Sequence, residues 1–261
     1  MPFSDLIATV SEVTDGCTVA ATDDWLQGRT MYGGLSAAFC LEGAARQFGP
    51  LPPLRSAQFA FVGPASGEVT IRATLLRRGK STVFVSVDLS GDAGLATRAM
   101  LCYGAARPSA LEYRALAAPD VRSPDDYPQF FPSSGGASFF QHFDGRLAGG
   151  GGLFSQADQP TFTLWLRHRD RTDPTSTVAV IALTDAPPPA AFVKLPTPVP
   201  LSTMTWAVDF LTDSIETTDG WWLMRTIGDK IADGYASQAT TLWNAGRQPI
   251  LVCRQNIAVF A

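Results

Sequence analysis

Any chemistry in this sequence has to use carboxylates, hydroxyls, amides and backbone dipoles, because histidine is nearly absent. The chain has only two histidines, His142 and His168. This scarcity leaves little room for a histidine-based metal site or a Ser-His-Asp triad. The nucleophile motif GxSxG and the phosphate-binding motif GxxxxGK[ST] are also absent from the sequence.

Asp185 is the first candidate, because it follows the apolar run 178–183 and precedes the three prolines 187–189. A carboxylate at the C-terminal end of a helix faces the negative end of the helix dipole, which is mildly unfavourable and needs a reason. The plainer interpretation is a solvated Asp that begins the following turn, and local sequence alone favours it.

Gln255 and Thr203 are candidates in two strand-like segments. Gln255 is the only strongly polar side chain on the face that carries Leu251, Cys253 and Ile257. A buried amide must find partners, so Gln255 is either a satisfied core amide or a functional group. Thr203 alone indicates nothing, and simple strand alternation turns it away from the apolar face of its strand.

Tyr32, Gly33 and Gly34 stand just before the first helix. Two glycines there would let a ligand approach free N–H groups, which suit an anion or a developing oxyanion. The alternative is plain backbone freedom at a tight entry to the helix.

The first half of the chain reads as one helix followed by an antiparallel meander. Apolar residues recur with helical spacing from Leu35 to Phe48, and Gly49-Pro50 ends the helix. Its many small residues would let it lie close against a sheet. Alternating segments separated by short turns follow. These predicted strands span residues 56–62, 69–76, 82–89 and 95–103.

The second half repeats this plan. A helix is predicted from about Thr175 to Thr184, with Asp173 as the N-cap and Pro174 at the first helical position. One strand is predicted before it, and strands follow it as in the first half. The predicted strands span residues 161–169, 203–210, 221–228, 235–243 and 251–260.

A proline-rich stretch separates the two halves and is too long for an ordinary loop inside one unit. We therefore expect an N-terminal unit at 1–108, a linker at 109–135 and a C-terminal unit at 136–261. A helix followed by an antiparallel sheet, twice, indicates the α+β class. Joining the sheets edge to edge would protect exposed strand edges and create a seam, where ligand sites are common.

Composition excludes several classes of protein. The net charge is −4 and no basic stripe occurs, so we expect no nucleic-acid partner. No stretch approaches the roughly 20 apolar residues of a membrane span, and the first residues do not resemble a secretory signal. The four cysteines are scattered, which argues against disulfides or a zinc site and favours a reduced, cytoplasmic setting.

Together these features resemble the bacterial type II acyl-CoA thioesterases and their thioesterase-like relatives, which are double-hotdog proteins. The resemblance covers nearly the whole chain and rests on the segments 32–34, 182–185, 201–204 and 254–256. That family uses an Asp, a Thr and a Gln, in this chain order, to orient a hydrolytic water. The matching residues here are Asp185, Thr203 and Gln255.

The resemblance implies an enzyme of fatty acid metabolism that hydrolyses an acyl-CoA thioester to a free acid and CoA, without a metal or other cofactor. Tyr32, Gly33 and Gly34 would bind the substrate, although the family commonly has His-Gly-Gly at these positions. Hotdog units tend to assemble through sheet edges or faces, so we expect a homodimer.

Two alternatives remain open from the sequence. A non-catalytic protein that binds acyl-CoA or a lipid-like ligand would keep an apolar tunnel without turnover, lined by aromatic candidates. These candidates are Trp165, Trp206, Phe210, Trp221 and Trp222. A hotdog hydratase or dehydratase would normally rely on a histidine with a carboxylate or Asn, and the positions of the two histidines make it the weaker alternative.

Overall fold

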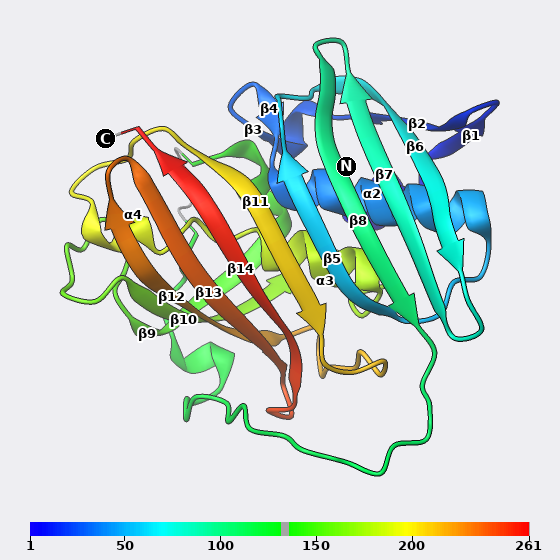
Figure 1. The fold of residues 1–261 in the computed structure, drawn as a ribbon. Helices are drawn as coiled ribbons and strands as arrows, with labels where there is room; N and C mark the ends of the chain where they lie inside the picture. The colour runs from blue at the N-terminus through cyan, green and yellow to red at the C-terminus, as the bar shows by residue number, and fades with distance from the viewer. Residues whose placement is uncertain (132–135, 261) are drawn as a thin grey trace.

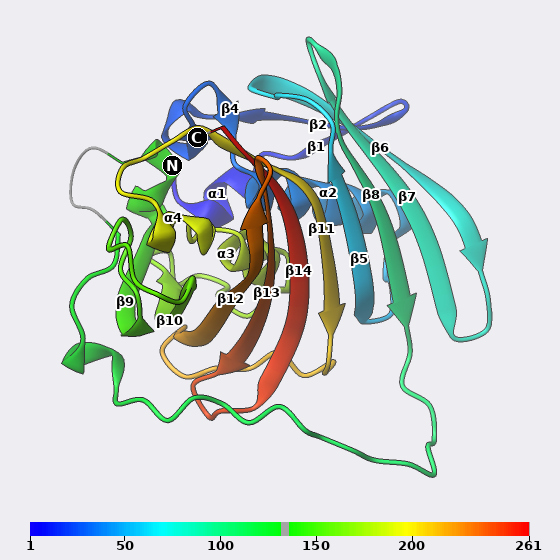
Figure 2. The ribbon, with the colours of Figure 1, turned by 60° about the vertical axis from the view of Figure 1, so that its left-hand side comes forward.

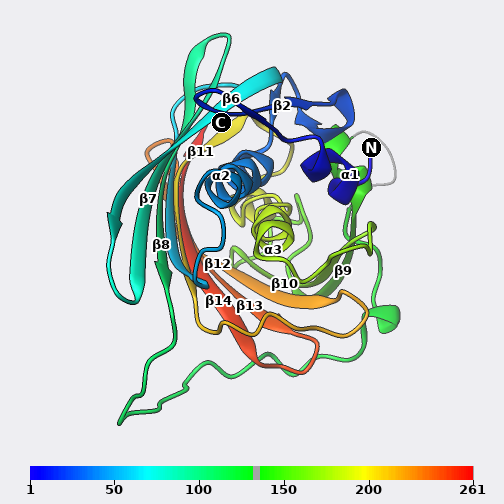
Figure 3. The same ribbon diagram turned by 90° about the vertical axis from the view of Figure 1, so that its right-hand side faces the viewer.

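Two apolar helices lie side by side inside one curved sheet, as the end-on view in Figure 3 shows. The computed structural model describes residues 1–131 and 136–260. The longer helix, α2, belongs to the N-terminal half, and α3 belongs to the C-terminal half (Figure 1). No helix in the described part of the chain is long and apolar enough to cross a membrane.

The N-terminal half contains the predicted helix and meander, preceded by short elements that were not predicted. Its helices and strands are α1 (Phe3–Ala8), β1 (Ser11–Val13), β2 (Gly16–Ala21), η1 (Asp23–Trp25), β3 (Leu26–Gln27), β4 (Thr30–Met31), α2 (Gly33–Phe48), β5 (Leu54–Phe61), β6 (Gly67–Arg78), β7 (Thr82–Gly91) and β8 (Gly94–Gly104). The helix and all four predicted strands are therefore confirmed, with strand ends that move by a few residues.

The C-terminal half repeats the pattern and adds one edge strand. Its elements are η2 (Pro124–Asp126), η3 (Ser138–His142), β9 (Phe143–Gly150), β10 (Thr161–His168), α3 (Thr177–Thr184), α4 (Ala191–Lys194), β11 (Leu201–Phe210), β12 (Trp222–Ala232), β13 (Tyr235–Asn244) and β14 (Pro249–Val259). The predicted helix start was wrong in detail. Ser176, rather than Asp173, is the N-cap, and its hydroxyl accepts a hydrogen bond from the N–H of Ala179.

Strand order confirms the architectural repeat. The large sheet runs β1-β2-β6-β7-β8-β5-β11-β14-β13-β12-β10-β9, and β3 and β4 form a separate two-stranded sheet. Among the repeated strands of the large sheet, the last one before the helix lies farthest from the junction of the halves, and the first one after the helix lies at that junction. The order is β2-β6-β7-β8-β5 in the N-terminal half and β10-β12-β13-β14-β11 in the C-terminal half. Strand β2 thus occupies the place in the N-terminal half that β10 occupies in the C-terminal half.

The halves join where β5 pairs with β11 in an antiparallel ladder, so the sheet continues from one unit to the other (Figure 2). Trp206 lies opposite Phe59 in this ladder, and their ring centroids are 5.4 Å apart. One buried apolar cluster includes residues of both halves. The α+β double-hotdog architecture expected from the sequence is therefore observed, as one continuous sheet around two helices.

Small residues let α2 approach the sheet closely, as its composition predicts. A Cβ atom on Gly43 would lie only 2.5 Å from Cγ2 of Ile71 on β6. Helix α3 is apolar all round, and it is enclosed by α2 and the sheet. Its C-terminal end meets the N-terminal end of α2, which brings Asp185 next to the two glycines of α2.

Part of the predicted linker packs against the outer face of the C-terminal half of the sheet. The indole N–H of Trp165 donates a hydrogen bond to the carbonyl of Arg122, and Arg247 donates to the carbonyls of Pro119 and Val121. Positions 132–135 of that linker lie outside the described residues. We propose that the units divide before residue 116. From there onward the chain contacts the C-terminal half, because the indole N–H of Trp243 donates a hydrogen bond to the carbonyl of Leu116.

Candidate active site

Asp185 is the C-cap residue of α3, where the helix ends with backbone angles φ −96° and ψ 1°. Its side chain is partly accessible and faces a cavity of about 630 Å³. Among the described residues that line this cavity, Asp185 is the only charged one. Burial raises the pKa of Asp185 to about 7, although hydrogen bonds from Gln255 and from the N–H of Gly34 lower it.

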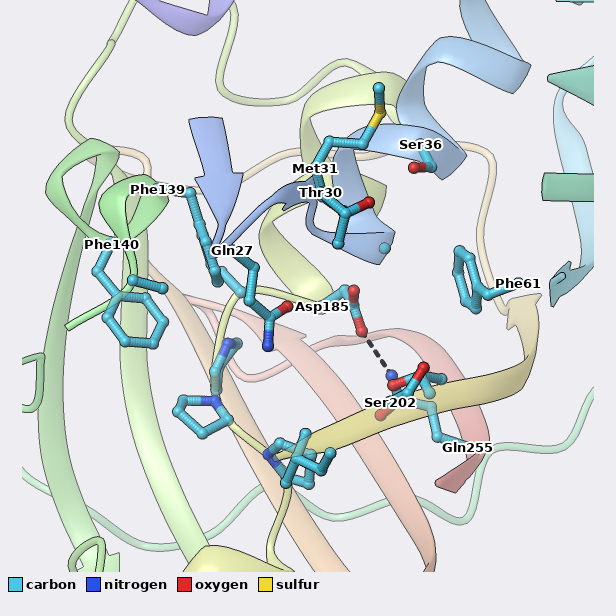
Figure 4. Close-up of a pocket in the computed structure, with 18 of the residues that line it drawn as sticks. Gln27, Thr30, Met31, Ser36, Phe61, Phe139, Phe140, Asp185, Ser202 and Gln255 are labelled. Carbon is cyan, nitrogen blue, oxygen red and sulfur yellow. Dashed lines mark hydrogen bonds between the residues drawn. The ribbon is translucent and has the colours of Figure 1, made fainter. Parts of the chain in front are cut away.

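Gln255 lies on β14 and connects directly to this carboxyl group. Its side-chain amide Nε2 donates a hydrogen bond to Oδ1 of Asp185 at 2.5 Å (Figure 4). Gln255 is 9% exposed, and it lines the cavity together with Asp185. The sequence left open whether this amide was a core group or a site group, and the structure places it in contact with Asp185.

Thr203 also lines the cavity, on the same face of the sheet as Gln255, and the prediction that it points away was wrong. The register of β11 against β14 shifts between Thr203 and Thr205, where one extra residue is inserted. Thr203 consequently pairs with Ile257, which shares the inner face of β14 with Gln255. Such a bulge reverses the alternation of side chains beyond it, and here it turns the side chain of Thr203 inward.

The two glycines before α2 allow the helix to approach Asp185. A Cβ atom on Gly33 would lie 2.8 Å from Oδ2 of Asp185, and one on Gly34 would lie 2.7 Å from the carbonyl oxygen of Ala182. Any larger residue would therefore push α2 away from the end of α3. Gly33 lines the cavity, and the N-cap of this helix forms no side-chain hydrogen bond. The N–H of Leu35 bonds to the carbonyl of Tyr32, so Gly33 and Gly34 provide the N–H groups that the first turn can offer to the site.

Tyr32 lies behind this contact rather than on the cavity wall. Its ring is 1% exposed and stacks on Phe139, with centroids 4.1 Å apart. The hydroxyl donates a hydrogen bond to the carbonyl of Ala182, and burial raises the pKa of that hydroxyl well above its usual value. Tyr32 therefore joins the start of α2 to the last turn of α3.

Sequence reasoning missed Gln238 on β13. Its Nε2 donates to Oε1 of Gln255 at 2.5 Å, and its own Oε1 accepts a hydrogen bond from the N–H of Ala190 at 2.8 Å. A signal was present, because Gln238 alternates with Ala236, Thr240 and Leu242 on the inner face of the strand. A long amide on an apolar face needs partners there as much as Gln255 does.

The cavity extends to both sides of Asp185. One side, which we call the aromatic arm, is lined by Phe139, Phe140, Phe154, Phe192 and the prolines 187–189. The other, the hydroxyl arm, is lined by Ser36, Thr97 and Phe61 and opens at Val62 and Pro64. Figure 4 shows Phe139 and Phe140 on one side of Asp185, and Ser36 and Phe61 on the other.

The aromatic residues offered by the sequence as a tunnel lining do not line this cavity. Trp206, Phe210 and Trp222 belong to the main core, whereas Trp165 and Trp221 are covered on the outer face by part of the predicted linker. Large aromatic side chains are more often buried in a core than placed along a ligand site. The aromatic wall is formed instead by phenylalanines outside the long strands.

Neither histidine reaches the cavity. His142 stacks on Trp25, with ring centroids 3.8 Å apart, and contacts Asp24. His168 is buried at the end of β10, and burial lowers its pKa to about 4. In the described part of the chain, no three His, Cys, Asp or Glu side chains gather as metal ligands.

The continuous sheet, the two enclosed helices and the polar site between them define a double-hotdog protein. Solved structures share this fold over nearly their whole length. A hot dog fold protein of unknown function from Alicyclobacillus acidocaldarius is 25% identical, with a TM-score of 0.89 and coverage of 98% of this chain and 97% of that one. A putative thioesterase II from Thermobifida fusca is 20% identical, with a TM-score of 0.84 and coverage of 100% and 98%. The tesB protein of Mycobacterium avium subs paratuberculosis is 16% identical, with a TM-score of 0.81 and coverage of 99% of both chains.

Family profiles match both halves of the sequence. The profile for the acyl-CoA thioesterase C-terminal domain matches residues 118–259, and the profile for the N-terminal domain matches residues 21–104. No curated protein matches the chain. The chain belongs to the acyl-CoA thioesterase family.

Proposed function

We propose that this protein hydrolyses an acyl-CoA thioester to the free acid and CoA, using a water molecule held by Asp185, Thr203 and Gln255. One observation carries the proposal. A carboxyl group with a pKa of about 7 lies in a largely apolar cavity, in contact with an amide and on the same wall as a hydroxyl group. A general base works best when its pKa is near the operating pH.

In the proposed reaction, Asp185 removes a proton from the water while the hydroxide oxygen bonds to the thioester carbonyl carbon. Thr203 and the second N–H of the Gln255 amide position the water. The C–S bond then breaks, and the leaving thiolate takes the proton from Asp185. The products are a carboxylic acid and a thiol, so atoms and protons balance without a co-reactant.

The negative charge that develops on the carbonyl oxygen needs a donor, and the N-terminus of α2 supports this role. The N–H of Gly34 already bonds to Asp185, so the N–H of Gly33 is the candidate that faces the cavity. Backbone N–H groups fixed at a helix N-terminus stabilise an oxyanion without rearrangement. Tyr32 would act indirectly, by holding this helix end against α3.

The two arms suit the two parts of the substrate. The aromatic arm offers phenylalanine and proline surfaces to an acyl chain, whereas the hydroxyl arm offers Ser36 and Thr97 to the amide groups of the pantetheine portion. The hydroxyl arm also reaches the surface at Val62, which is 61% exposed and would leave room for the bulky nucleotide of CoA outside.

The test is thiol release from acyl-CoA esters of increasing chain length, with the wild-type protein and Asp185→Asn. We expect turnover by the wild type and a loss of at least about 100-fold in the variant, which is the lower range for a missing general base. Absence of turnover on every ester, with ligand binding retained, would favour a non-catalytic acyl-CoA-binding protein. A variant as active as the wild type would remove Asp185 from the mechanism.

A further inference from the structure

We propose that Gln238 is a positioning residue that fixes the orientation of the Gln255 side-chain amide, so that its N–H group and not its carbonyl faces Asp185. Gln238 lies directly opposite Gln255 in the β13–β14 ladder. It is 5% exposed and does not line the cavity, so it acts through Gln255 and not on the substrate. The role of this relay in catalysis rests on the proposed function.

The direction of every hydrogen bond in the relay follows from the backbone. The N–H of Ala190 can only donate, so the atom of Gln238 that faces it at 2.8 Å must be the carbonyl Oε1. The amide nitrogen of Gln238 then faces Gln255 and donates to its Oε1. The remaining side of the Gln255 amide, its Nε2, is thereby directed at Oδ1 of Asp185.

Ala190 can start the relay because of the residues before it. Prolines 187–189 have no N–H group, so Ala190 provides the first backbone donor after Ala186. Ala190 is fully buried at the start of α4 and packs with Val193 and Phe162. The donor that sets the amide orientation is therefore held by a proline-stiffened turn and by core packing.

A reversed Gln255 amide would face Asp185 with its carbonyl oxygen. Two acceptors in contact would repel each other unless Asp185 kept its proton, so a reversed amide makes the carboxyl a weaker acid. The other titratable groups that face Asp185 are Tyr32, on the α2 side, and Cys253, on β14. Burial raises the pKa of Tyr32 well above its usual value and that of Cys253 to about 12, so both stay neutral near pH 7.

The first test is the pH profile of kcat/KM in Gln238→Met, which keeps a long unbranched side chain but has no amide to donate or accept. We expect the rising limb to move to higher pH by about one unit, the effect of losing one hydrogen bond to a charged group. At a pH below the limb this shift is about a tenfold loss of activity. In the Asp185→Asn background the same change should move no rising limb, because the relay shifts the limb only through the carboxyl of Asp185.

Thr240→Val is the matched control. Thr240 lies two residues further along the same face of β13 and is equally buried, and its hydroxyl bonds to Thr226 outside the relay. This variant should lose stability without moving the limb. If the rising limb of the pH profile does not move in Gln238→Met, or moves equally in Thr240→Val, then Gln238 has only a structural role.

A second measurement does not depend on turnover. The difference in unfolding free energy between the wild type and Asp185→Asn, followed against pH, reports the pKa of Asp185 in the folded protein. When both proteins also carry Gln238→Met, the midpoint of this pH dependence should move to higher pH by the same amount as the rising limb. If no ester is hydrolysed but this midpoint moves, the relay stands and the proposed function fails. If esters are hydrolysed but the midpoint stays, the relay fails.

Discussion

Thr203 reaches the cavity through a local irregularity in its strand, and this gives its hydroxyl a distinct role to test. In Thr203→Val the shape of the side chain is kept and the hydroxyl is lost. We expect kcat/KM to fall by roughly 10- to 100-fold, the value of one hydrogen bond to a water that becomes charged. Thr203→Ser should retain most of the activity, and thiol-release kinetics compare the two variants.

Thr205 supplies the control for that comparison. It lies on the outer, solvent-exposed face of the same strand, so Thr205→Val alters a β-branched hydroxyl residue without touching the cavity. Equal activity in Thr203→Val and Thr203→Ser would show that the hydroxyl does not hold the water.

The raised pKa of Asp185 also predicts how the stability of the protein changes with pH. Its pKa is raised from 3.8 to about 7 in the folded protein, so between these values the folded state keeps a proton that the unfolded state has lost. Stability is therefore highest below about pH 4 as far as this group is concerned, and it falls as the pH rises to about 7. Three pKa units set an upper limit of about 4 kcal/mol for this loss.

Asp185→Asn should abolish this pH-dependent contribution. Denaturant unfolding should be measured for both proteins at several pH values. From about pH 4 to about pH 7 the unfolding free energy of the variant should rise relative to that of the wild type, and above this range the difference should stay constant. Parallel curves over this range would mean that the carboxyl titrates in the folded protein as it does in the unfolded chain.

At the scale of elements, the N-terminal end of α2 meets the C-terminal end of α3. This contact places the carboxyl of Asp185 beside the N–H groups of Gly33 and Gly34. In Gly34→Ala the new Cβ would lie 2.6 Å from a ring carbon of Tyr32 and 2.9 Å from Cβ of Asp185. Helix α2 would have to withdraw from α3, so we expect a loss of about 1–3 kcal/mol in stability, typical of overpacking. The hydrogen bond from residue 34 to Asp185 would be lost, and activity would fall with it.

Gly79→Ala is a suitable control for thermal unfolding and for thiol release. Gly79 lies in the turn between β6 and β7, where a Cβ would meet its nearest neighbour at an ordinary 3.4 Å. If Gly34→Ala behaved like this control, the close approach of α2 to α3 would not matter for the site.

The long elements were predictable because periodic burial of apolar residues decides them. Helix α2 and the meander strands follow from spacing alone, and the joining of the two sheets was expected because it protects exposed strand edges. Strand β2 was missed, although a strand was predicted before the second helix and the repeat required its counterpart before the first. Its six residues, Gly16–Ala21, carry too little alternation to stand out.

The residue types of the candidate site were visible in the sequence, but their geometry was not. Gln255 is visible as an amide on an apolar face, and Asp185 as an acid at an unfavourable helix end. The inward turn of Thr203 depends on a bulge, which shifts the register by one residue and leaves no mark in the sequence pattern. Gln238 was overlooked because its partner Ala190 comes from a distant turn, and only the fold brings the two together.

At the scale of the whole molecule, the site needs both halves. Asp185, Thr203 and Gln255 come from the C-terminal half, whereas Gly33, Gly34 and the hydroxyl arm come from the N-terminal half. The sheet continues across the β5–β11 ladder, and one buried cluster includes residues from both halves. A unit separated from its partner would expose a strand edge and lose one wall of the cavity.

This continuity predicts that the two halves unfold together. Trp206 is 1% exposed and faces Phe59 across the ladder, so Trp206→Ala should cost about 3–5 kcal/mol, as for other large side chains removed from a core. If unfolding is a single cooperative transition, amide hydrogen exchange should accelerate by the same factor in the most protected strands of both halves, β7 and β13. Phe260→Ala, which removes a 64% exposed ring near the C-terminus, should leave both strands unchanged. Faster exchange confined to β13 would mean that the C-terminal half opens without its partner, and that the site can come apart while the N-terminal half stays folded.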